Sequence, residues 1–208
     1  MGRKTKITKE MIMEAAFELL EEGGIGAVAI KSIAAKLGCS TQPVSWQFGS
    51  MVELKKALYY YAGQKLYSIM PEKMAGRDAL EAFFVSGVCY ISIACDHPRT
   101  FRFLNVDDPL ETIGEDIIGD TSIFSMPFDR EATKMLAEEY KTSPEMVDVA
   151  VRDSVIYTHG LAVMMMFDKF RLPKDVACKM VFDMGIKLLS DVGIDAGERD
   201  YEQIMKSI

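Results

Sequence analysis

Residues 38–48, GCSTQPVSWQF, contain the single tryptophan of the 208-residue chain. The serine before Thr41 is a preferred N-cap, and Pro43 is tolerated in a first helical turn, so the stretch predicts a short helix. At about 100° per residue, Val44 lies on one face of this helix and Trp46 lies roughly opposite. If Val44 faces the core, Trp46 points to solvent. The alternative is that Trp46 folds back into the core, because large aromatic side chains are seldom left exposed.

Two helices are predicted before this one. The first begins at Thr8, a preferred N-cap residue, and ends at Gly23 after apolar residues spaced as on one face of a helix. The second runs from Ile30 to Leu37 and is closed by Gly38. Two short helices that meet at a glycine-containing turn are typical of the helix-turn-helix motif, whose second helix enters the DNA major groove.

Length and composition are those of a globular protein with one large domain or two small ones, since 49% of the residues are hydrophobic and 26% are charged. No uninterrupted run of 18 apolar residues occurs, so we expect no membrane span. Glutamates interrupt the segment after the basic N-terminus, which excludes a secretory signal pattern. We therefore predict a cytoplasmic protein.

Side chains that carry chemistry are sparse. The cysteines form no C-x-x-C pair and have no zinc spacing with the two histidines, so we predict reduced thiols, no metal and no cofactor. The acidic segment 105–127 has no calcium-loop spacing, which favours a solvated loop over a metal site. No nucleophile set, carboxylate pair or phosphate loop indicates an enzyme. The cysteines are Cys39, Cys89, Cys95 and Cys178.

Charge is distributed unevenly along the chain. Residues 1–65 hold nine Lys and Arg against six Glu, a net +3, whereas the whole chain carries −7, so residues 66–208 carry −10. A basic N-terminal part on an acidic body indicates an anionic partner for that part alone. Within it, Arg3, Lys4 and Lys6 are suited to an arm along a DNA backbone or minor groove.

The remainder of the chain is predicted to be helical, so the fold class is all-α. After a fourth helix at about 50–68, the sequence PEKMAGRD at 71–78 marks a joint. Residues 79–95 are apolar nearly all round and predict a buried central helix. Two long apolar helices, at about 144–170 and 173–192, follow later. No alternation typical of strands is present.

Residues 8–60 resemble the N-terminal DNA-binding region of the tetracycline-repressor (TetR) family. The resemblance is carried by the AA…L…G helix end, the IA…G-x-S turn between Ile33 and Ser40, and the aromatic Phe48. It also includes the Ser-x-x-Glu-Leu pattern at 50–54, where the fourth helix starts. The resemblance implies a helix-turn-helix domain at 1–48 and a helical effector-binding and dimerisation domain at 49–208, connected by the fourth helix.

For function, the resemblance implies a homodimer formed through the last two helices, which binds a palindromic operator. It further implies a repressor that is released by a largely apolar small molecule. A two-fold dimer can place its recognition helices about 34–36 Å apart, one turn of DNA. The alternative is a helical adaptor that keeps the fold without binding DNA and acts through protein partners.

In such regulators the outer face of the third helix lies against base edges. Gln42 matches adenine N6 and N7, whereas Pro43 and Trp46 suit a thymine methyl group. Three residues depart from the family pattern: Ser45 replaces a Tyr, Met51 replaces a Lys, and Ala29 replaces a capping Thr or Ser. The predicted DNA-binding residues are Lys31, Ser40, Thr41, Gln42, Pro43, Ser45, Trp46, Gln47, Ser50 and Lys55, with Lys56 as a further substitute for the missing lysine.

The resemblance also implies a small-molecule pocket between the later helices. A Met or aromatic residue at helical spacing equally predicts ordinary core, and a histidine in an apolar helix can be a packed, hydrogen-bonded residue or a ligand contact. The candidate pocket residues are Phe84, Tyr90, Phe101, Phe103, Phe124, Tyr157, His159 and Met164.

Overall fold

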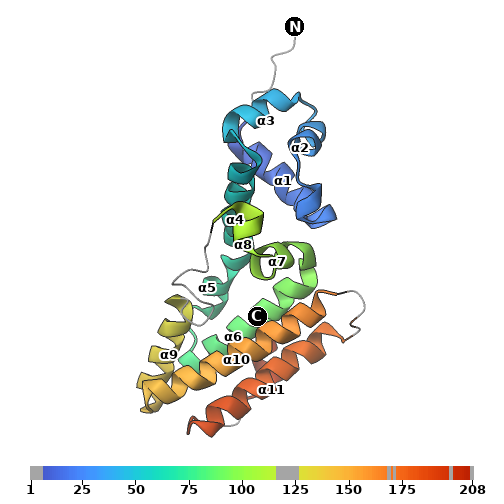
Figure 1. Cartoon of the computed structure of the whole chain (residues 1–208). Helices are drawn as coiled ribbons and strands as arrows, with labels where there is room; N and C mark the ends of the chain where they lie inside the picture. The colour runs from blue at the N-terminus through green and yellow to red at the C-terminus, as the bar shows by residue number, and fades with distance from the viewer. Residues whose placement is uncertain (1–6, 116–126, 168–169, 171, 197–198, 207–208) are drawn as a thin grey trace. The chain divides into compact units, whose positions relative to one another are not determined.

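The structure is a computed structural model in which every regular element of the described residues is a helix, which confirms the all-α prediction (Figure 1). The described residues are 7–115, 127–167, 170, 172–196 and 199–206, with side chains of the segment that begins at 127 described from residue 132.

Packing divides the chain into two compact units. Unit 1 comprises Met1–Tyr67 and His97–Ile117, and unit 2 comprises Ser68–Asp96 and Ile118–Ile208. The chain therefore passes from one unit to the other three times. The domain boundary predicted after residue 48 concerns function rather than packing and stays a prediction.

Unit 1 is built around the helix-turn-helix. Its elements are α1 (Lys9–Gly23), the 3-10 turn η1 (Ile25–Ala27), α2 (Ile30–Lys36), α3 (Thr41–Phe48), α4 (Met51–Tyr67), α7 (Pro98–Asn105) and α8 (Pro109–Ile113). Thr8 caps α1 as predicted, because its hydroxyl accepts a hydrogen bond from the Met11 N–H at 3.3 Å. Ile33 of α2 and Val44 of α3 are fully buried, so both short helices are fixed by apolar contacts.

The turn between α2 and α3 has the geometry that a glycine permits. Gly38 has a φ of +64°, and its N–H donates to the Ala35 carbonyl at 3.2 Å. The Cys39 N–H donates to the Ala34 carbonyl at 2.9 Å, which completes a Schellman motif. Ser40 occupies the N-cap position of α3, but its side chain makes no capping hydrogen bond.

The helix α7 is fixed to the end of α1 by one carboxylate. Glu21 Oε2 lies 2.7 Å from His97 Nδ1, and the buried Thr100 hydroxyl donates to the other carboxylate oxygen. The Arg99 guanidinium also donates to the Glu21 backbone carbonyl at 2.9 Å. Although α7 comes far later in the sequence, it is part of the same unit as the helix-turn-helix.

Unit 2 surrounds α6 with the other helices. Its elements are α5 (Ile69–Met74), α6 (Ala79–Asp96), α9 (Pro127–Tyr140), α10 (Pro144–Met165), α11 (Lys174–Asp191) and α12 (Tyr201–Met205). The helix α6 contacts α5, α9, α10 and α11, which confirms the predicted central helix. The predicted helix at 144–170 is shorter than expected and ends at Met165, and α12 follows the last predicted helix.

By length and composition, α6 is apolar enough to cross a membrane, with a mean hydropathy of 1.5 over its 18 residues. The criterion of an uninterrupted apolar run missed this helix, because Glu81, Ser86 and Asp96 interrupt it. In the structure 56% of that window is buried inside the protein. A central helix packed against four others has the same composition for a different reason, since most of its surface is in the core.

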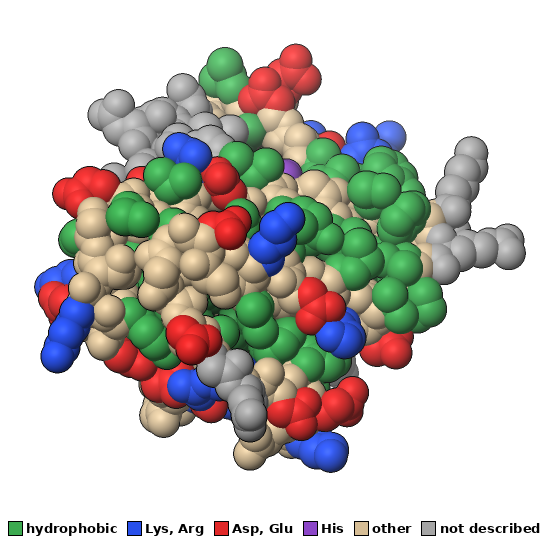
Figure 2. Space-filling model, turned by 90° about the horizontal axis from the view of Figure 1, so that it is seen from below, with side chains coloured by type: hydrophobic (Ala, Val, Ile, Leu, Met, Phe, Trp, Pro, Cys, Tyr) green, Lys and Arg blue, Asp and Glu red, His purple; other side chains and the backbone are tan. Residues whose placement is uncertain are grey.

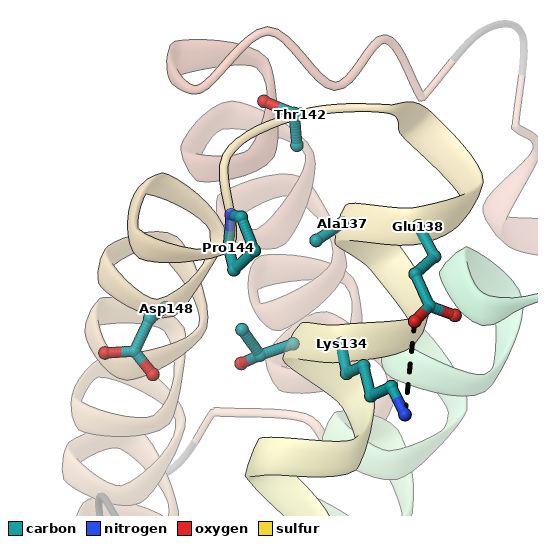
Figure 3. Close-up of a pocket in the computed structure, with 7 residues that line it drawn as sticks. Lys134, Ala137, Glu138, Thr142, Pro144 and Asp148 are labelled. Atoms are coloured by element: carbon teal, nitrogen blue, oxygen red, sulfur yellow. Dashed lines mark ion pairs between the residues drawn. The ribbon is translucent and has the colours of Figure 1, made fainter.

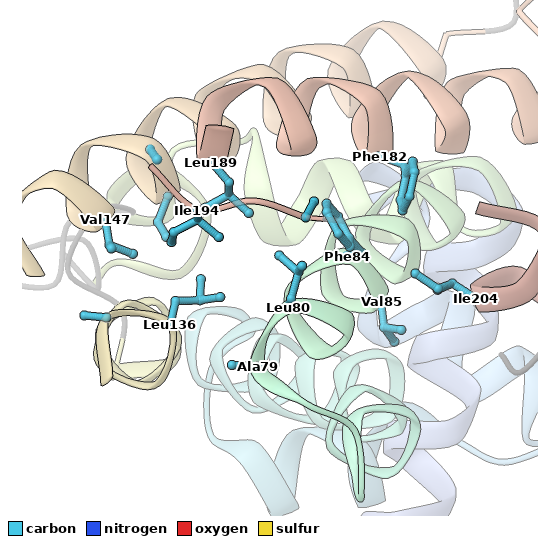
Figure 4. Packing of buried hydrophobic residues seen from close by; sticks show 14 of the residues in the cluster. Ala79, Leu80, Phe84, Val85, Leu136, Val147, Phe182, Leu189, Ile194 and Ile204 are labelled. Atoms are coloured by element: carbon cyan, nitrogen blue, oxygen red, sulfur yellow. The ribbon is translucent and has the colours of Figure 1, made fainter. Parts of the chain in front are cut away.

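The core of unit 2 is a largely aliphatic cluster that contains an aromatic contact between α6 and α11. Figure 4 shows Phe84 of α6 facing Phe182 of α11, and their ring centroids lie 4.5 Å apart. A Cβ at Gly185 would lie 2.9 Å from the Phe84 ring, so this close approach requires glycine. Ile194 and Ile204, which follow α11, are buried in the same cluster. The C-terminal segment therefore completes the core.

Candidate nucleic-acid interface

The outer face of α3 carries an exposed tryptophan. The Trp46 side chain is 87% exposed, whereas Val44 of the same helix is fully buried. The predicted orientation of α3 is therefore confirmed, and the alternative that Trp46 folds into the core is wrong. Thr41, Gln42 and Ser45 are also exposed on this helix. The result is one large aromatic side chain surrounded by amide and hydroxyl groups.

This combination has the chemistry for contacts with base edges. Gln42 can donate and accept at the same time, and the Thr41 and Ser45 hydroxyls can do either. The Trp46 ring offers apolar area to a thymine methyl group and an indole N–H to an acceptor. Pro43 is half-buried in the first turn of α3, where its missing N–H costs little.

Cations beside α3 differ in whether they are already paired. Lys36 Nζ lies 2.9 Å from Glu18 and 2.8 Å from Glu22, and Lys56 Nζ lies 3.0 Å from Glu115. The hydrogen bonds that these lysines donate to their glutamate partners raise the pKa of both lysines, so their charges are held within unit 1. Among the described residues, Lys31 and Lys55 form no ion pair. Of the two lysines predicted to substitute for the lysine missing at position 51, Lys56 is paired, whereas Lys55 is not in an ion pair among the described residues.

Two of the remaining predicted DNA contacts have roles within the fold. The Ser50 hydroxyl accepts a hydrogen bond from the Glu53 N–H at 3.2 Å and so caps α4. The Gln47 side-chain amide donates to the Ile7 carbonyl at 2.7 Å and is half-buried. Ser40 is exposed before α3. The basic residues Arg3, Lys4 and Lys6 lie outside the described residues.

The residues predicted to line a ligand pocket are divided between the two units. Phe101 and Phe103 of α7 are buried in unit 1, where Phe103 stacks edge-on against Tyr59 at 5.6 Å between centroids. Phe84 is part of the unit 2 core. Phe124 lies outside the described residues.

Within unit 2, two of the predicted pocket residues form a pair. The Tyr90 hydroxyl lies 2.8 Å from His159 Nδ1, and burial lowers the pKa of His159. Burial therefore disfavours the charged imidazole, which is hydrogen-bonded between α6 and α10. Tyr157 is partly exposed and Met164 is exposed on α10, so neither belongs to the core.

A surface pocket that the sequence did not predict lies between α9 and α10. It has a volume of about 420 Å³ and contains none of the predicted pocket residues. Figure 3 shows Lys134 and Glu138 on α9, joined by a 4.0 Å ion pair, with Pro144 and Asp148 on α10. The Thr133 hydroxyl, which also lines it, is buried without a hydrogen-bond partner. Helical periodicity does not predict a surface pocket of this kind.

The long helices of unit 2 expose apolar side chains in a row, which we call the apolar stripe. It consists of Val149, Ile156 and Met164 on α10 with Val176 and Met180 on α11. Figure 2 shows hydrophobic side chains grouped on one side of the molecule. Several exposed apolar side chains on neighbouring helices make this surface a candidate for an interaction. In the part of the chain that the structure describes, no cluster of His, Cys, Asp and Glu is placed to hold a metal ion.

Comparison with known proteins bears on both units. Residues 12–58 match the family model for bacterial regulatory proteins of the tetR family. The chain is 20% identical over 186 residues to YobS, an uncharacterized HTH-type transcriptional regulator of Bacillus subtilis (strain 168), covering 88% of this chain and 92% of that protein.

Two solved structures share the fold. One is a TetR-like transcriptional regulator from Rhodococcus sp. RHA1, with a TM-score of 0.65 and 14% identity over 91% of this chain and 98% of that one. The other is a single-substitution variant of TetR from Acinetobacter baumannii AYE in complex with minocycline, with a TM-score of 0.58 and 16% identity over 89% and 96%. At these identities the likeness concerns the fold.

Proposed function

We propose that the chain is a transcriptional regulator of the tetR type, whose family model residues 12–58 match, and that it acts as a dimeric, cytoplasmic repressor. In this proposal the dimer binds a palindromic operator through two copies of α3 and leaves it when a small molecule binds. The proposal starts from the fold and the helix-turn-helix. It adds that the chain forms a dimer, binds an operator and responds to a ligand.

The observation that carries the DNA-binding proposal is the 87% exposure of Trp46. A side chain of this size gains most from a partner that removes it from water, by roughly 25 cal/mol for each Å² covered. The major groove is wide enough for a helix, and its base edges offer methyl groups as well as donors and acceptors. The polar side chains of Gln42 and Thr41, which lie on the same helix, can bond to those donors and acceptors.

The apolar stripe supports a dimer. In a two-fold dimer the same stripe would face its own copy, so α10 and α11 of two chains would form a four-helix bundle. An obligate interface of this kind buries roughly 2,000 Å² or more. Such a dimer can set two recognition helices about 34–36 Å apart, which fits one turn of DNA.

A small-molecule effector is supported by fold likeness, since one neighbour was solved with bound minocycline. For this chain we propose a largely apolar effector that binds within unit 2, where Tyr90 and His159 offer a hydrogen-bonding pair. The effector can act only through different affinities for the DNA-bound and free states. A 100-fold loss of DNA affinity requires about 2.7 kcal/mol of coupling.

The test is fluorescence anisotropy with labelled duplexes tiled from the DNA that flanks the protein's own gene. Titrations at two salt concentrations with competitor DNA separate specific from nonspecific binding, because phosphate contacts alone give strongly salt-dependent, sequence-independent affinity. We expect saturable binding to one tile that survives competitor. Weak binding that is equal for all tiles would contradict an operator next to the gene and favour a partner other than DNA for α3.

A further inference from the structure

The pocket between α9 and α10 combines an apolar lining with a few polar groups. Ala137 on α9 and Pro144 on α10 supply apolar wall, and two threonine side chains lie beside them. All of the lining residues belong to unit 2. The volume of about 420 Å³ lies within the range of small-molecule sites, which are mostly apolar with a few polar groups that fix the orientation of the ligand.

One polar group of the pocket is a hydroxyl that the fold does not use. Thr133 on α9 is only 8% exposed, and among the described residues its Oγ1 atom has no hydrogen-bond partner. A buried hydroxyl without a partner destabilises a folded protein. Threonine in a helix adopts two side-chain rotamers, so rotation about the Cα–Cβ bond can turn this hydroxyl toward the pocket that the residue lines. A ligand with an N–H group would then supply the missing partner.

The Thr142 hydroxyl is a second acceptor in the same pocket. It donates a 3.3 Å hydrogen bond to the Val192 backbone carbonyl, just after the end of α11. A hydroxyl has one donor and two acceptor lone pairs, so the Thr142 oxygen can still accept. The fold therefore fixes the position of this oxygen and leaves its lone pairs for a donor.

The third polar group is an unpaired carboxylate. Figure 3 shows Lys134 and Glu138 joined on α9, 4.0 Å apart, so these two charges offset each other. Asp148 is exposed on α10 and forms no ion pair with the residues that the structure describes. The pocket therefore has one negative charge in excess. Residues 66–208 as a whole carry a net −10, and this field also favours a cation.

We propose that this pocket binds an organic molecule with a primary ammonium group on an apolar body. An ammonium group of this kind has three N–H donors. Thr133, Thr142 and Asp148 offer three acceptors for them, one of which is charged. The apolar body of the molecule lies against Ala137 and Pro144.

This site is separate from the Tyr90–His159 pair proposed to contact the effector. Asp148 precedes His159 on α10 by 11 residues, which corresponds to about 16 Å of helix. The inference does not depend on DNA binding, so it can fail while the proposed function stands, and the reverse is also true.

The first experiment compares three probes that share a phenyl body: 2-phenylethylamine, which is a cation, 2-phenylethanol, which is neutral, and phenylacetate, which is an anion. Each is titrated into the full chain with isotopically labelled alanine methyl groups, and NMR follows the Ala137 resonance. We expect the amine to shift this resonance and to bind at least tenfold more tightly than the alcohol, because charge-assisted hydrogen bonds are stronger. An amine dissociation constant above about 10 mM, or equal affinity for the alcohol, would overturn the proposal.

A matched pair of variants tests the carboxylate. Asp148→Asn keeps the shape of the side chain and removes its charge, so it should weaken amine binding at least tenfold and leave the affinity for the alcohol unchanged. Asp191→Asn makes the same change at an exposed position of α11 outside the pocket, and it should bind the amine like the wild type. If both variants keep the wild-type affinity, Asp148 does not contact the amine and the proposed site is wrong.

Thr133→Val tests the hydroxyl, because it replaces the hydroxyl with a methyl group of similar size. Without a probe, the urea midpoint should rise, since an unpartnered buried hydroxyl is removed. The affinity for the amine should fall about threefold, since one acceptor is lost. A lower urea midpoint with unchanged amine affinity would mean that the hydroxyl is bonded within the fold, and this result would contradict the proposed site.

Discussion

Units 1 and 2 both expose apolar side chains, but they do so in different ways. On α3, Trp46 stands alone among Thr41, Gln42 and Ser45, which are all polar. On α10 and α11, the apolar stripe consists of five exposed aliphatic and thioether side chains. An isolated rigid aromatic among donors and acceptors suits a nucleic-acid groove, whereas several exposed aliphatic side chains on two neighbouring helices suit another helix pair. The neighbours of an exposed apolar residue therefore indicate its partner better than its exposure does.

The largest expected effect is at the apolar stripe. Ile156 is 50% exposed on α10, and Ile156→Glu would bury two carboxylates in a symmetric interface. We expect the dimer dissociation constant to rise at least 100-fold, or about 2.7 kcal/mol, as measured by sedimentation velocity over a concentration series. Gln203→Glu, at an exposed polar site on α12, is the matched control. A dimer dissociation constant that Ile156→Glu leaves unchanged would show that the apolar stripe is not a dimer interface.

The second effect is on DNA binding. Trp46→Ala should weaken operator affinity about tenfold to 100-fold, within the roughly 1–3 kcal/mol that one specific contact contributes. The melting temperature should not fall, because the removed side chain is almost fully exposed. Leu110→Ala removes an apolar side chain that is 59% exposed on α8 of the same unit and should leave affinity unchanged. An equal loss of operator affinity in both variants would show that Trp46 has no specific role in DNA binding.

A third comparison uses one glycine from each unit. At Gly185 of α11 a Cβ would meet the buried Phe84 ring, so Gly185→Ala should destabilise the protein by roughly 1–3 kcal/mol. At Gly63 of α4 nothing lies within 4 Å of the added Cβ, so Gly63→Ala should stabilise it by roughly 0.5–1 kcal/mol. Urea denaturation of both variants gives the signs. A Gly185→Ala variant that is as stable as the wild type, or more stable, would contradict the tight packing between Gly185 and Phe84.

The smallest effect concerns pH and unit 2 alone. Burial lowers the pKa of His159 below 6.5 in the folded protein. Below pH 6.5, His159 therefore binds a proton more readily in the unfolded chain than in the folded protein. The free energy of unfolding is highest above pH 6.5 and declines as pH falls through the folded pKa of His159. Urea midpoints of the wild type and His159→Gln between pH 5 and 8 should diverge on the acid side. Parallel curves would mean that His159 titrates normally.

Local patterns sufficed for the helix-turn-helix. The spacing of Ile12, Ile33 and Val44 predicted which faces are buried, and all three side chains are fully buried. The glycine closure at Gly38 and the outward direction of Trp46 also followed from local chemistry. These features depend on residues within a few turns of one another, where helical periodicity carries the information.

Contacts between residues far apart in the sequence could not be predicted from local patterns. Neither the hydrogen bond from Gln47 to Ile7 nor the attachment of α7 through Glu21 has a periodic signal. The pocket candidates show the same limit, because Phe101 and Phe103 have the spacing of any buried helix face. Periodicity indicates that a side chain is covered, but it does not tell which element covers it.

The peptide bond between Asp96 and His97 joins α6 of unit 2 directly to α7 of unit 1. For the construction of chimeric regulators, this junction rules out a simple exchange of the first 67 residues. Such a graft would leave out Phe101 and Phe103, whose buried rings complete unit 1, and would expose the apolar surface that they cover. A transplanted DNA-binding unit must carry α7 and α8 with it, so the smallest portable piece is discontinuous in the sequence.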